Sequence, residues 1–174
     1  MNKFIASFAI AALLAACSPT AAPITETPAL SADQLAAADA QAANEAAVHA
    51  AHDAYVAAIN ANDVERVAAV LTDDVVYQAP HEPEIAGKDA VTAWVKAYFD
   101  AYSTKWEKTT LELVVTGQWA FERYAYKATD TPKAGGPAIE DKGKGINIYH
   151  LDYDSAWRLA RDSWSSDLPI PTPK

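Results

Sequence analysis

Residues 55–80, YVAAINANDVERVAAVLTDDVVYQAP, constrain the fold more than any other stretch of the chain. They predict the end of a helix, a short second helix, an acidic turn over 72–74 and a strand over 75–78 that stops at Pro80. Asn62 tolerates the left-handed backbone that ends a helix, and Asp63 is a good N-cap for the next one. The strand assignment depends on its β-branched and aromatic residues. Helices and sheet are therefore expected to alternate within one domain.

A long alanine-rich helix is expected before this stretch. It begins with a capping-box pattern at Ser31 and Gln34 and ends near Asn60. Its second half carries an apolar stripe of Val48, Ala51, His52, Tyr55 and Ile59. The first half is weakly amphipathic, and the sequence leaves open whether residues 31–43 are ordered. We expect His49 and His52 in solvated or edge positions, because no partner at catalytic spacing is visible.

A third helix and four long strands are expected to follow. The helix begins after Gly87, and its stripe comprises Val91, Trp94, Val95, Tyr98 and Tyr102. Alternating residues predict strands over 105–116, 119–127, 145–151 and 156–165, with a tight turn at 117–118 and a Pro/Gly loop over 128–143. Alternation groups Leu111 with Leu113 and Val115, and Trp119 with Phe121 opposite Glu122 and Tyr124. It also groups Asn147 with Tyr149, and Trp157 with Leu159 and Arg161 opposite Asp162.

This order of elements predicts an α+β fold, with a strongly curved, mostly antiparallel sheet wrapped on three helices. Both faces of the later strands carry apolar residues, so we expect the outer face to pack on a second copy in a homodimer. A half-exposed outer face is the alternative. The formal charge of −9 argues against binding to nucleic acid or to anionic lipid surfaces.

The first 17 residues, MNKFIASFAIAALLAAC, have the length and hydropathy of a secretory signal. Small residues before Cys17 resemble a bacterial lipobox, which implies that Cys17 is lipidated; an ordinary signal with an incidental cysteine is the alternative. Ser18 after the cysteine implies the outer membrane. We therefore expect a signal peptide over 1–16, a lipidated cysteine and Pro-rich tether over 17–30, a folded domain over 31–168 and a tail over 169–174. The expected location is the cell envelope, lipid-anchored and facing the periplasm, with the outer membrane favoured.

Residues 55–80 followed by IAGKDAVTAW resemble the cone-shaped superfamily named after nuclear transport factor two. GQWAFERYAYKATDTPKAGGPAIEDKGKG and WRLARDSWSSDLP extend the likeness over roughly residues 40–168. The chain is most similar to uncharacterised bacterial SnoaL-like proteins. The superfamily includes ketosteroid isomerase, scytalone dehydratase and polyketide cyclases, so the resemblance implies a cone-shaped fold and leaves the function open.

The ketosteroid isomerase pattern implies roles for three positions. Its hydroxyl donor corresponds to Tyr55, its protonated acid to Asn147, and its catalytic base to Ala79, which cannot take a proton. We therefore expect hydrogen-bond donors without a proton-moving carboxylate. The cone implies a pocket between helices and sheet. The expected ligand-binding residues are Tyr55, Trp94, Tyr98, Trp119, Asn147 and Tyr149, and the catalytic residues are unknown.

Three functions follow as alternatives. The first is an envelope lipoprotein whose domain binds a small, partly apolar molecule. The second is an isomerase, dehydratase or cyclase with a non-standard base, and the third is a non-catalytic dimerisation or assembly module. We expect no cofactor and no metal site, because the histidines are dispersed and the only thiol is Cys17. His81 beside Glu82 is a weak candidate base, and Glu122, Arg123, Arg161 and Asp162 are expected in cross-strand ion pairs.

Overall fold

The computed structural model describes residues 30–169. The chain divides into two units, Met1–Ser31 and Ala32–Lys174, and every helix and strand described below belongs to the second. The predicted signal peptide, Cys17 and most of the tether lie outside the described residues, as do residues 170–174. Within the described part of the chain, no helix is both long and apolar enough to cross a membrane.

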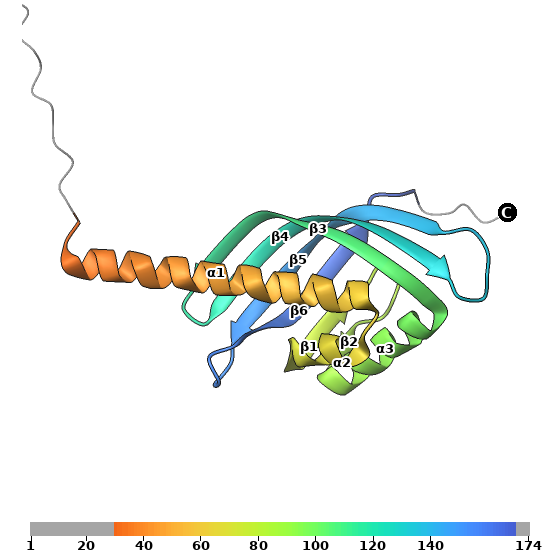
Figure 1. Ribbon diagram of the computed structural model, residues 1–174, viewed down its shortest axis with the longest axis horizontal. Coiled ribbons are helices and arrows are strands. Elements are labelled where there is room, and N and C mark those ends of the chain that lie inside the picture. The colour runs from red at the N-terminus through yellow and green to blue at the C-terminus, as the bar shows by residue number, and fades with distance from the viewer. Residues whose placement is uncertain (1–29, 170–174) are drawn as a thin grey trace, which may run out of the picture. The chain divides into compact units, whose positions relative to one another are not determined.

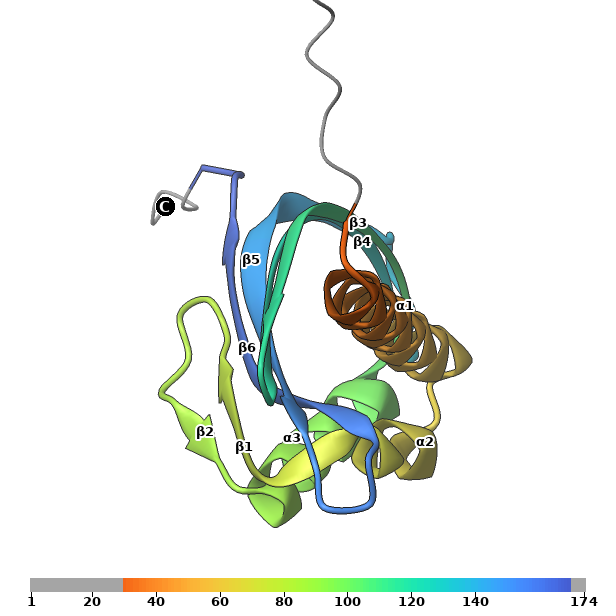
Figure 2. The same ribbon diagram turned by 90° about the vertical axis from the view of Figure 1, so that its left-hand side faces the viewer.

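The second unit contains three helices and one six-stranded sheet (Figure 1). The helices are α1 (Ala32–Ala61), α2 (Val64–Ala69) and α3 (Lys88–Ala101). The strands are β1 (Leu71–Gln78), β2 (Ile85–Ala86), β3 (Tyr102–Thr116), β4 (Trp119–Pro132), β5 (Ile139–Leu151) and β6 (Trp157–Ser166). The strand order is β2-β1-β6-β5-β4-β3, and only the β1–β6 pair is parallel. In Figure 2 the sheet curves around α1, which confirms the predicted α+β fold.

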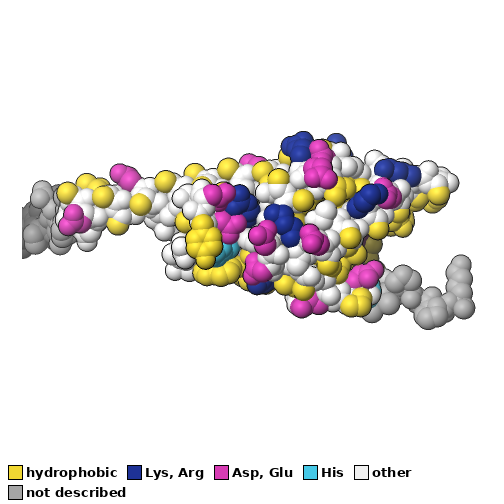
Figure 3. Space-filling model, turned by 90° about the horizontal axis from the view of Figure 1, so that it is seen from below, with side chains coloured by type: hydrophobic (Ala, Val, Ile, Leu, Met, Phe, Trp, Pro, Cys, Tyr) yellow, Lys and Arg dark blue, Asp and Glu magenta, His cyan; other side chains and the backbone are white. Residues whose placement is uncertain are grey.

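Helix α1 packs on the sheet through its second half. Its buried residues, Val48, His52, Tyr55 and Ala58, recur at helical spacing. In contrast, residues 32–43 are all exposed. Figure 3 shows that this part of α1 carries small apolar side chains and few charges, whereas acidic and basic side chains lie interspersed over the rest of that face. Gln41 donates to the Val115 carbonyl at 3.2 Å, and the high helix propensity of alanine accounts for a helix that continues through these exposed residues.

The junction between α1 and α2 also closes one edge of the sheet. Asn62 has φ 52°, and the Asp63 side chain caps α2 by accepting from the Arg66 amide, as predicted. The side-chain amide of Asn62 accepts from the Thr104 N–H and donates to its carbonyl, at 2.9 Å each. Asn60 bonds the backbone of Trp106 in the same way. These amides occupy backbone groups that edge strand β3 would otherwise leave unpaired.

Three predicted boundaries were wrong. Strand β1 begins at Leu71, so the expected turn over 72–74 lies within the strand. The loop expected over 128–143 is largely sheet, because β4 continues to Pro132 and β5 starts at Ile139. The short strand β2 was not foreseen. Of the residues that suggested a long loop, Gly135, Gly136 and Pro137 lie at the tip of a long hairpin, whereas Pro132 ends β4 and Gly143 lies within β5.

Irregularities in β3 and β6 change which side chains face the interior. In β3 the pairing with β4 skips Leu111, and in β6 the pairing with β5 skips Ala160. A bulged residue reverses the alternation of faces beyond it. Leu111 is therefore exposed rather than grouped with Leu113 and Val115. In β6, Leu159 and Asp162 are both buried, although uninterrupted alternation places them on opposite faces.

Candidate functional site

A buried carboxylate on β6, Asp162, collects three donors from three other elements. Tyr55 of α1 donates to Oδ2 at 2.9 Å, and Tyr124 of β4 donates to Oδ1 at 2.6 Å. Lys108 of β3 donates to Oδ2 at 3.0 Å, and the exposed fractions of the Lys108 and Asp162 side chains are 1% and 3%. The carboxylate and the ammonium group thus compensate each other in an interior where either charge alone is strongly unfavourable.

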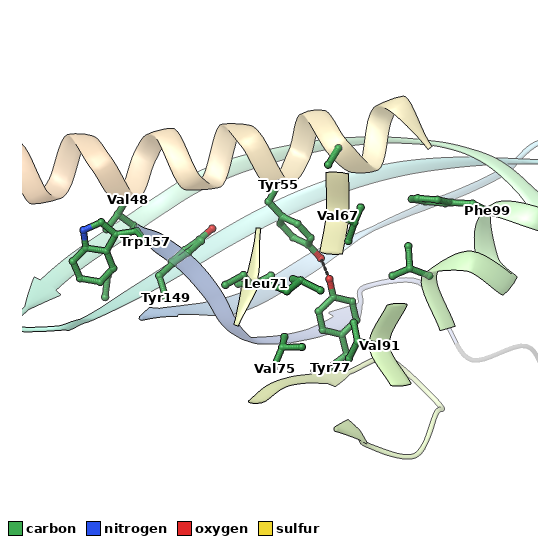
Figure 4. Packing of buried hydrophobic residues seen from close by; sticks show 14 of the residues in the cluster. Val48, Tyr55, Val67, Leu71, Val75, Tyr77, Val91, Phe99, Tyr149 and Trp157 are labelled. Atoms are coloured by element: carbon green, nitrogen blue, oxygen red, sulfur yellow. Dashed lines mark hydrogen bonds between the residues drawn. The ribbon is translucent and has the colours of Figure 1, made fainter. Parts of the chain in front are cut away.

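The hydroxyl of Tyr77 extends this cluster. Figure 4 shows Tyr55 and Tyr77 pointing toward each other, with their oxygens 2.7 Å apart. Because the single hydroxyl proton of Tyr55 is directed to Asp162, Tyr77 donates to Tyr55. Burial raises the pKa of both phenols well above the usual value, and the charge on Asp162 adds to this effect. Both remain neutral donors at physiological pH.

Aromatic rings enclose a cavity next to the Asp162 cluster. Its volume is about 40 Å³ and its accessible lining is almost entirely apolar, with Tyr55, Lys108 and Asp162 contributing to the lining at one end. The walls include Trp94 and Tyr98 of α3, Trp106 of β3 and Trp164 of β6. A single water needs roughly 10–15 Å³ on this measure. The cavity therefore has space for a small group and is far below the hundreds of Å³ that hold a drug-sized ligand.

The cavity walls are supported by ring-to-ring contacts and by hydrogen bonds from their polar atoms to neighbouring residues. Trp94 stacks on Tyr98 with centroids 5.5 Å apart, and Trp164 meets Trp94 and Trp106 edge-on, at 6.3 Å each. The Tyr98 hydroxyl donates to Asp130 at 2.6 Å. These walls are apolar toward the cavity, so its polar chemistry is concentrated at the Asp162 end.

A second buried carboxylate, Glu122 of β4, has its own set of donors. His52 Nδ1 lies 2.8 Å from Oε1 and 3.1 Å from Oε2. Thr110 donates to Oε1 at 2.6 Å. The Asn147 amide and the Tyr149 hydroxyl each donate to Oε2 at 3.0 Å. Burial alone would raise the pKa of Glu122, but the bonds from His52 and Thr110 outweigh it and lower the pKa to about 2.

Strand register brings the two carboxylates into one row across the sheet. Glu122 of β4 pairs with Asn147 of β5, which pairs with Asp162 of β6. Gly145 of β5 provides space for the Tyr124 ring: a Cβ added there would lie 2.4 Å from the ring carbon that carries the hydroxyl. The glycine thus allows Tyr124 to reach Asp162 along the interior of the sheet.

The predicted ligand-binding residues fall into three groups. Tyr55, Trp94 and Tyr98 line the cavity. Asn147 and Tyr149 are buried in the Glu122 cluster and do not line it. Trp119 does not line this cavity, because its position in the alternation of β4 puts it on the outer face, where it is 45% exposed and contacts His150; its role in binding stays a prediction.

Two further expectations were wrong. His52 is buried against Glu122 rather than solvated, and Tyr55 and Asn147 each contact a carboxylate.

The expected cross-strand ion pairs are confirmed for Arg123, which pairs with Glu112, and for Arg161, which pairs with Asp74. Asp162 faces the interior and pairs with Lys108, whereas Glu122 faces the interior and contacts His52. The carboxylates come from β4 and β6, so the alanine that follows β1 does not leave the site without an acid.

Sequence reasoning also missed Lys108. Its alternation with Trp106 and Thr110 indicates a shared face, but the bulge at Leu111 hides the fact that this face is the one buried further along at Val115.

Comparisons with known proteins agree with the fold. The SnoaL-like domain profile matches residues 52–165. A ketosteroid isomerase-like protein from Erwinia carotovora atroseptica is 30% identical, with a TM-score of 0.66 over 71% of this chain and 96% of that one. A conserved protein from Planctomyces limnophilus is 25% identical, with a TM-score of 0.66 over 71% and 98%.

A more distant structure shares the fold alone. It is a protein from Novosphingobium aromaticivorans provisionally assigned as a scytalone dehydratase, 15% identical with a TM-score of 0.69 over 75% of this chain and 89% of that one. No functionally curated protein matches significantly. The profile match covers most of the folded unit, and the chain therefore belongs to the SnoaL-like domain family.

Proposed function

We propose that this protein binds a small, partly apolar molecule in the aromatic cavity, with a carbonyl or hydroxyl group of the ligand directed at the Asp162 end. The observation that carries the proposal is the placement of Lys108, Asp162 and Tyr55 at the end of a cavity otherwise lined by aromatic and aliphatic side chains. A few polar groups at one end of an apolar cavity are typical of small-molecule sites.

The donors of the Asp162 cluster determine which polar groups fit. Tyr55 and Tyr124 each give their only proton to the carboxylate. An ammonium group has three N–H donors, and Lys108 directs one of them to Asp162. Lys108 is therefore the donor that a ligand oxygen would use, and the ligand would be an acceptor with a compact apolar body of a few heavy atoms.

An isomerase, dehydratase or cyclase is the second candidate. It is favoured by a carboxylate and an amine that both line the cavity, because perturbed titratable groups gather at catalytic sites. The description of the Erwinia protein as ketosteroid isomerase-like is consistent with this class. The missing acid at Ala79 no longer counts against it, since Asp162 is an alternative base.

Tryptophan fluorescence would test binding, because three of the cavity walls are indoles. Titration with 1-propanol and propionaldehyde should change the emission of the wild type and saturate. Trp94→Leu should weaken binding, whereas Trp119→Leu, a matched change on the outer face, should leave the affinity unchanged. Equal loss in both variants, or no saturable change in the wild type, would contradict the proposal.

We further propose that the domain is lipid-anchored in the cell envelope and assembles as a homodimer. The first proposal depends on the lipobox-like sequence at Cys17. The second depends on the outer sheet face, where Leu111, Val114, Trp119 and Ile146 are 39–50% exposed. Incorporation of labelled palmitate that Cys17→Ala abolishes would support the anchor.

A filled cavity that binds nothing, in a stable dimer, would favour the third alternative, an assembly module.

A further inference from the structure

The side-chain amine of Lys108 lies in surroundings that suit a covalent reaction as well as ligand binding. Lysine is among the residues least often buried completely, yet this side chain is 1% exposed. Its Nζ lies 4.0 Å from the centre of the Tyr124 ring and 4.7 Å from that of Tyr55. A buried ion pair is rarely needed for stability, because apolar side chains of similar size often replace it without loss. A role in the cavity explains its presence better.

We infer that Lys108 is a nucleophilic amine that forms a protonated imine with a small aldehyde or ketone held in the cavity. The inference rests on the proposed binding function, since the carbonyl compound must first enter between the tryptophan walls. The compound would carry its carbonyl carbon to Nζ at the polar end and leave its apolar part against Trp94 and Trp164.

Imine formation requires a neutral amine, and the surroundings of Lys108 favour the loss of its proton. Burial lowers the pKa of Lys108, and this effect outweighs the opposing influence of the Asp162 and Glu122 carboxylates. Lysines that are desolvated in apolar sites are the ones that act as amine nucleophiles. Asp162, at 3.0 Å, is placed to take a proton from the ammonium group.

The reaction is balanced with these groups alone. Asp162 removes one proton from the Lys108 ammonium, and the nitrogen lone pair then forms a bond to the carbonyl carbon while the C=O π pair moves to oxygen. A second proton passes from nitrogen to that oxygen, giving a carbinolamine. Asp162 returns its proton to the hydroxyl group, the C–O bond breaks, water leaves, and nitrogen forms the C=N bond. The net change is ammonium plus carbonyl compound to iminium plus water.

Reductive trapping on the full folded protein would test this. Propionaldehyde is added at limiting concentration with cyanoborohydride, and the modified lysine is identified by peptide mass spectrometry. We expect Lys108 to be modified several-fold faster than Lys105 and Lys127, which are exposed on the same sheet and act as internal controls. Faster modification of the exposed lysines, with Lys108 unmodified, would overturn the inference.

Variants add a second readout. Lys108→Met should remove the fast modification, and Lys105→Met should retain it. Because Lys108→Met leaves Asp162 without its cation and can impair folding, the wild-type peptide map decides the question by itself.

1-Propanol separates this inference from the function it rests on. It has the carbon chain of propionaldehyde but no carbonyl group. Saturable binding of both compounds without modification of Lys108 would overturn imine formation and leave binding intact. Failure of both compounds to bind would overturn the two together.

Discussion

The Glu122 cluster predicts a specific dependence of stability on pH. In Glu122→Gln the side chain keeps its shape but loses its charge. Thr110 donates to one oxygen, and Asn147 and Tyr149 donate to the other. Beside Asn147 the new NH₂ group meets another donor, and beside Thr110 the hydroxyl must turn to accept from it. The variant therefore disturbs these buried hydrogen bonds and removes the charge that lies against His52.

The magnitude follows from the pKa of Glu122, which falls from an ordinary value of 4.5 to about 2. Each pKa unit corresponds to about 1.4 kcal/mol, so the charged form contributes roughly 3 kcal/mol to the free energy of unfolding. Because the pKa is lowered in the folded state, this contribution is complete above pH 4.5 and is lost as the pH falls toward 2. Glu122→Gln should therefore be about 3 kcal/mol less stable than the wild type at pH 7 and should approach it near pH 2.

Urea denaturation followed by circular dichroism at a series of pH values would measure this difference. Glu112→Gln is the matched control, because Glu112 is half-exposed and pairs with Arg123 on the surface. Such pairs contribute at most about 1 kcal/mol. If the curves of the wild type and Glu122→Gln run parallel from pH 7 to pH 2, the account of Glu122 as a charged, multiply bonded group is wrong.

Three other changes test other parts of the structure. Gly145→Ala should lower the free energy of unfolding, measured by urea denaturation, by roughly 1–3 kcal/mol, because the new methyl group meets the Tyr124 ring. A neutral effect would show that the ring does not occupy that space. Asp162→Asn should destabilise by about 3–5 kcal/mol in the same assay, because Lys108 is left buried without its counter-ion; a loss below 1 kcal/mol would mean that the pair is solvated. Ile146→Lys, on the outer sheet face, should convert the proposed dimer to a monomer in sedimentation velocity without changing the unfolding curve; an unchanged sedimentation coefficient would place the interface elsewhere.

Helical spacing and strand alternation were enough to predict the fold. The stripe from Val48 to Tyr55 located the buried face of α1, and alternation placed Glu122 and Tyr124 on one face of β4 and Asn147 and Tyr149 on one face of β5. These patterns are local, so they can be read without knowledge of the tertiary structure.

The polar site was not predictable in the same way. A single bulge at Leu111 changes the face to which Lys108 belongs, and another at Ala160 does the same for Asp162 relative to Leu159. Nothing in the local sequence marks either position as a bulge. The pairing of His52 with Glu122 joins residues 70 positions apart and depends on the register between α1 and the sheet.

The indole N–H signals of the five tryptophans provide the most direct test of the proposed site. Trp94, Trp106 and Trp164 line the cavity, whereas Trp119 and Trp157 do not. In two-dimensional ¹⁵N–¹H spectra, addition of 1-propanol should shift the first three indole signals with one common saturation curve and leave the other two in place. Shifts confined to Trp119 or Trp157, or no saturable shift at any indole, would contradict the account of a ligand site at the Asp162 end of the cavity.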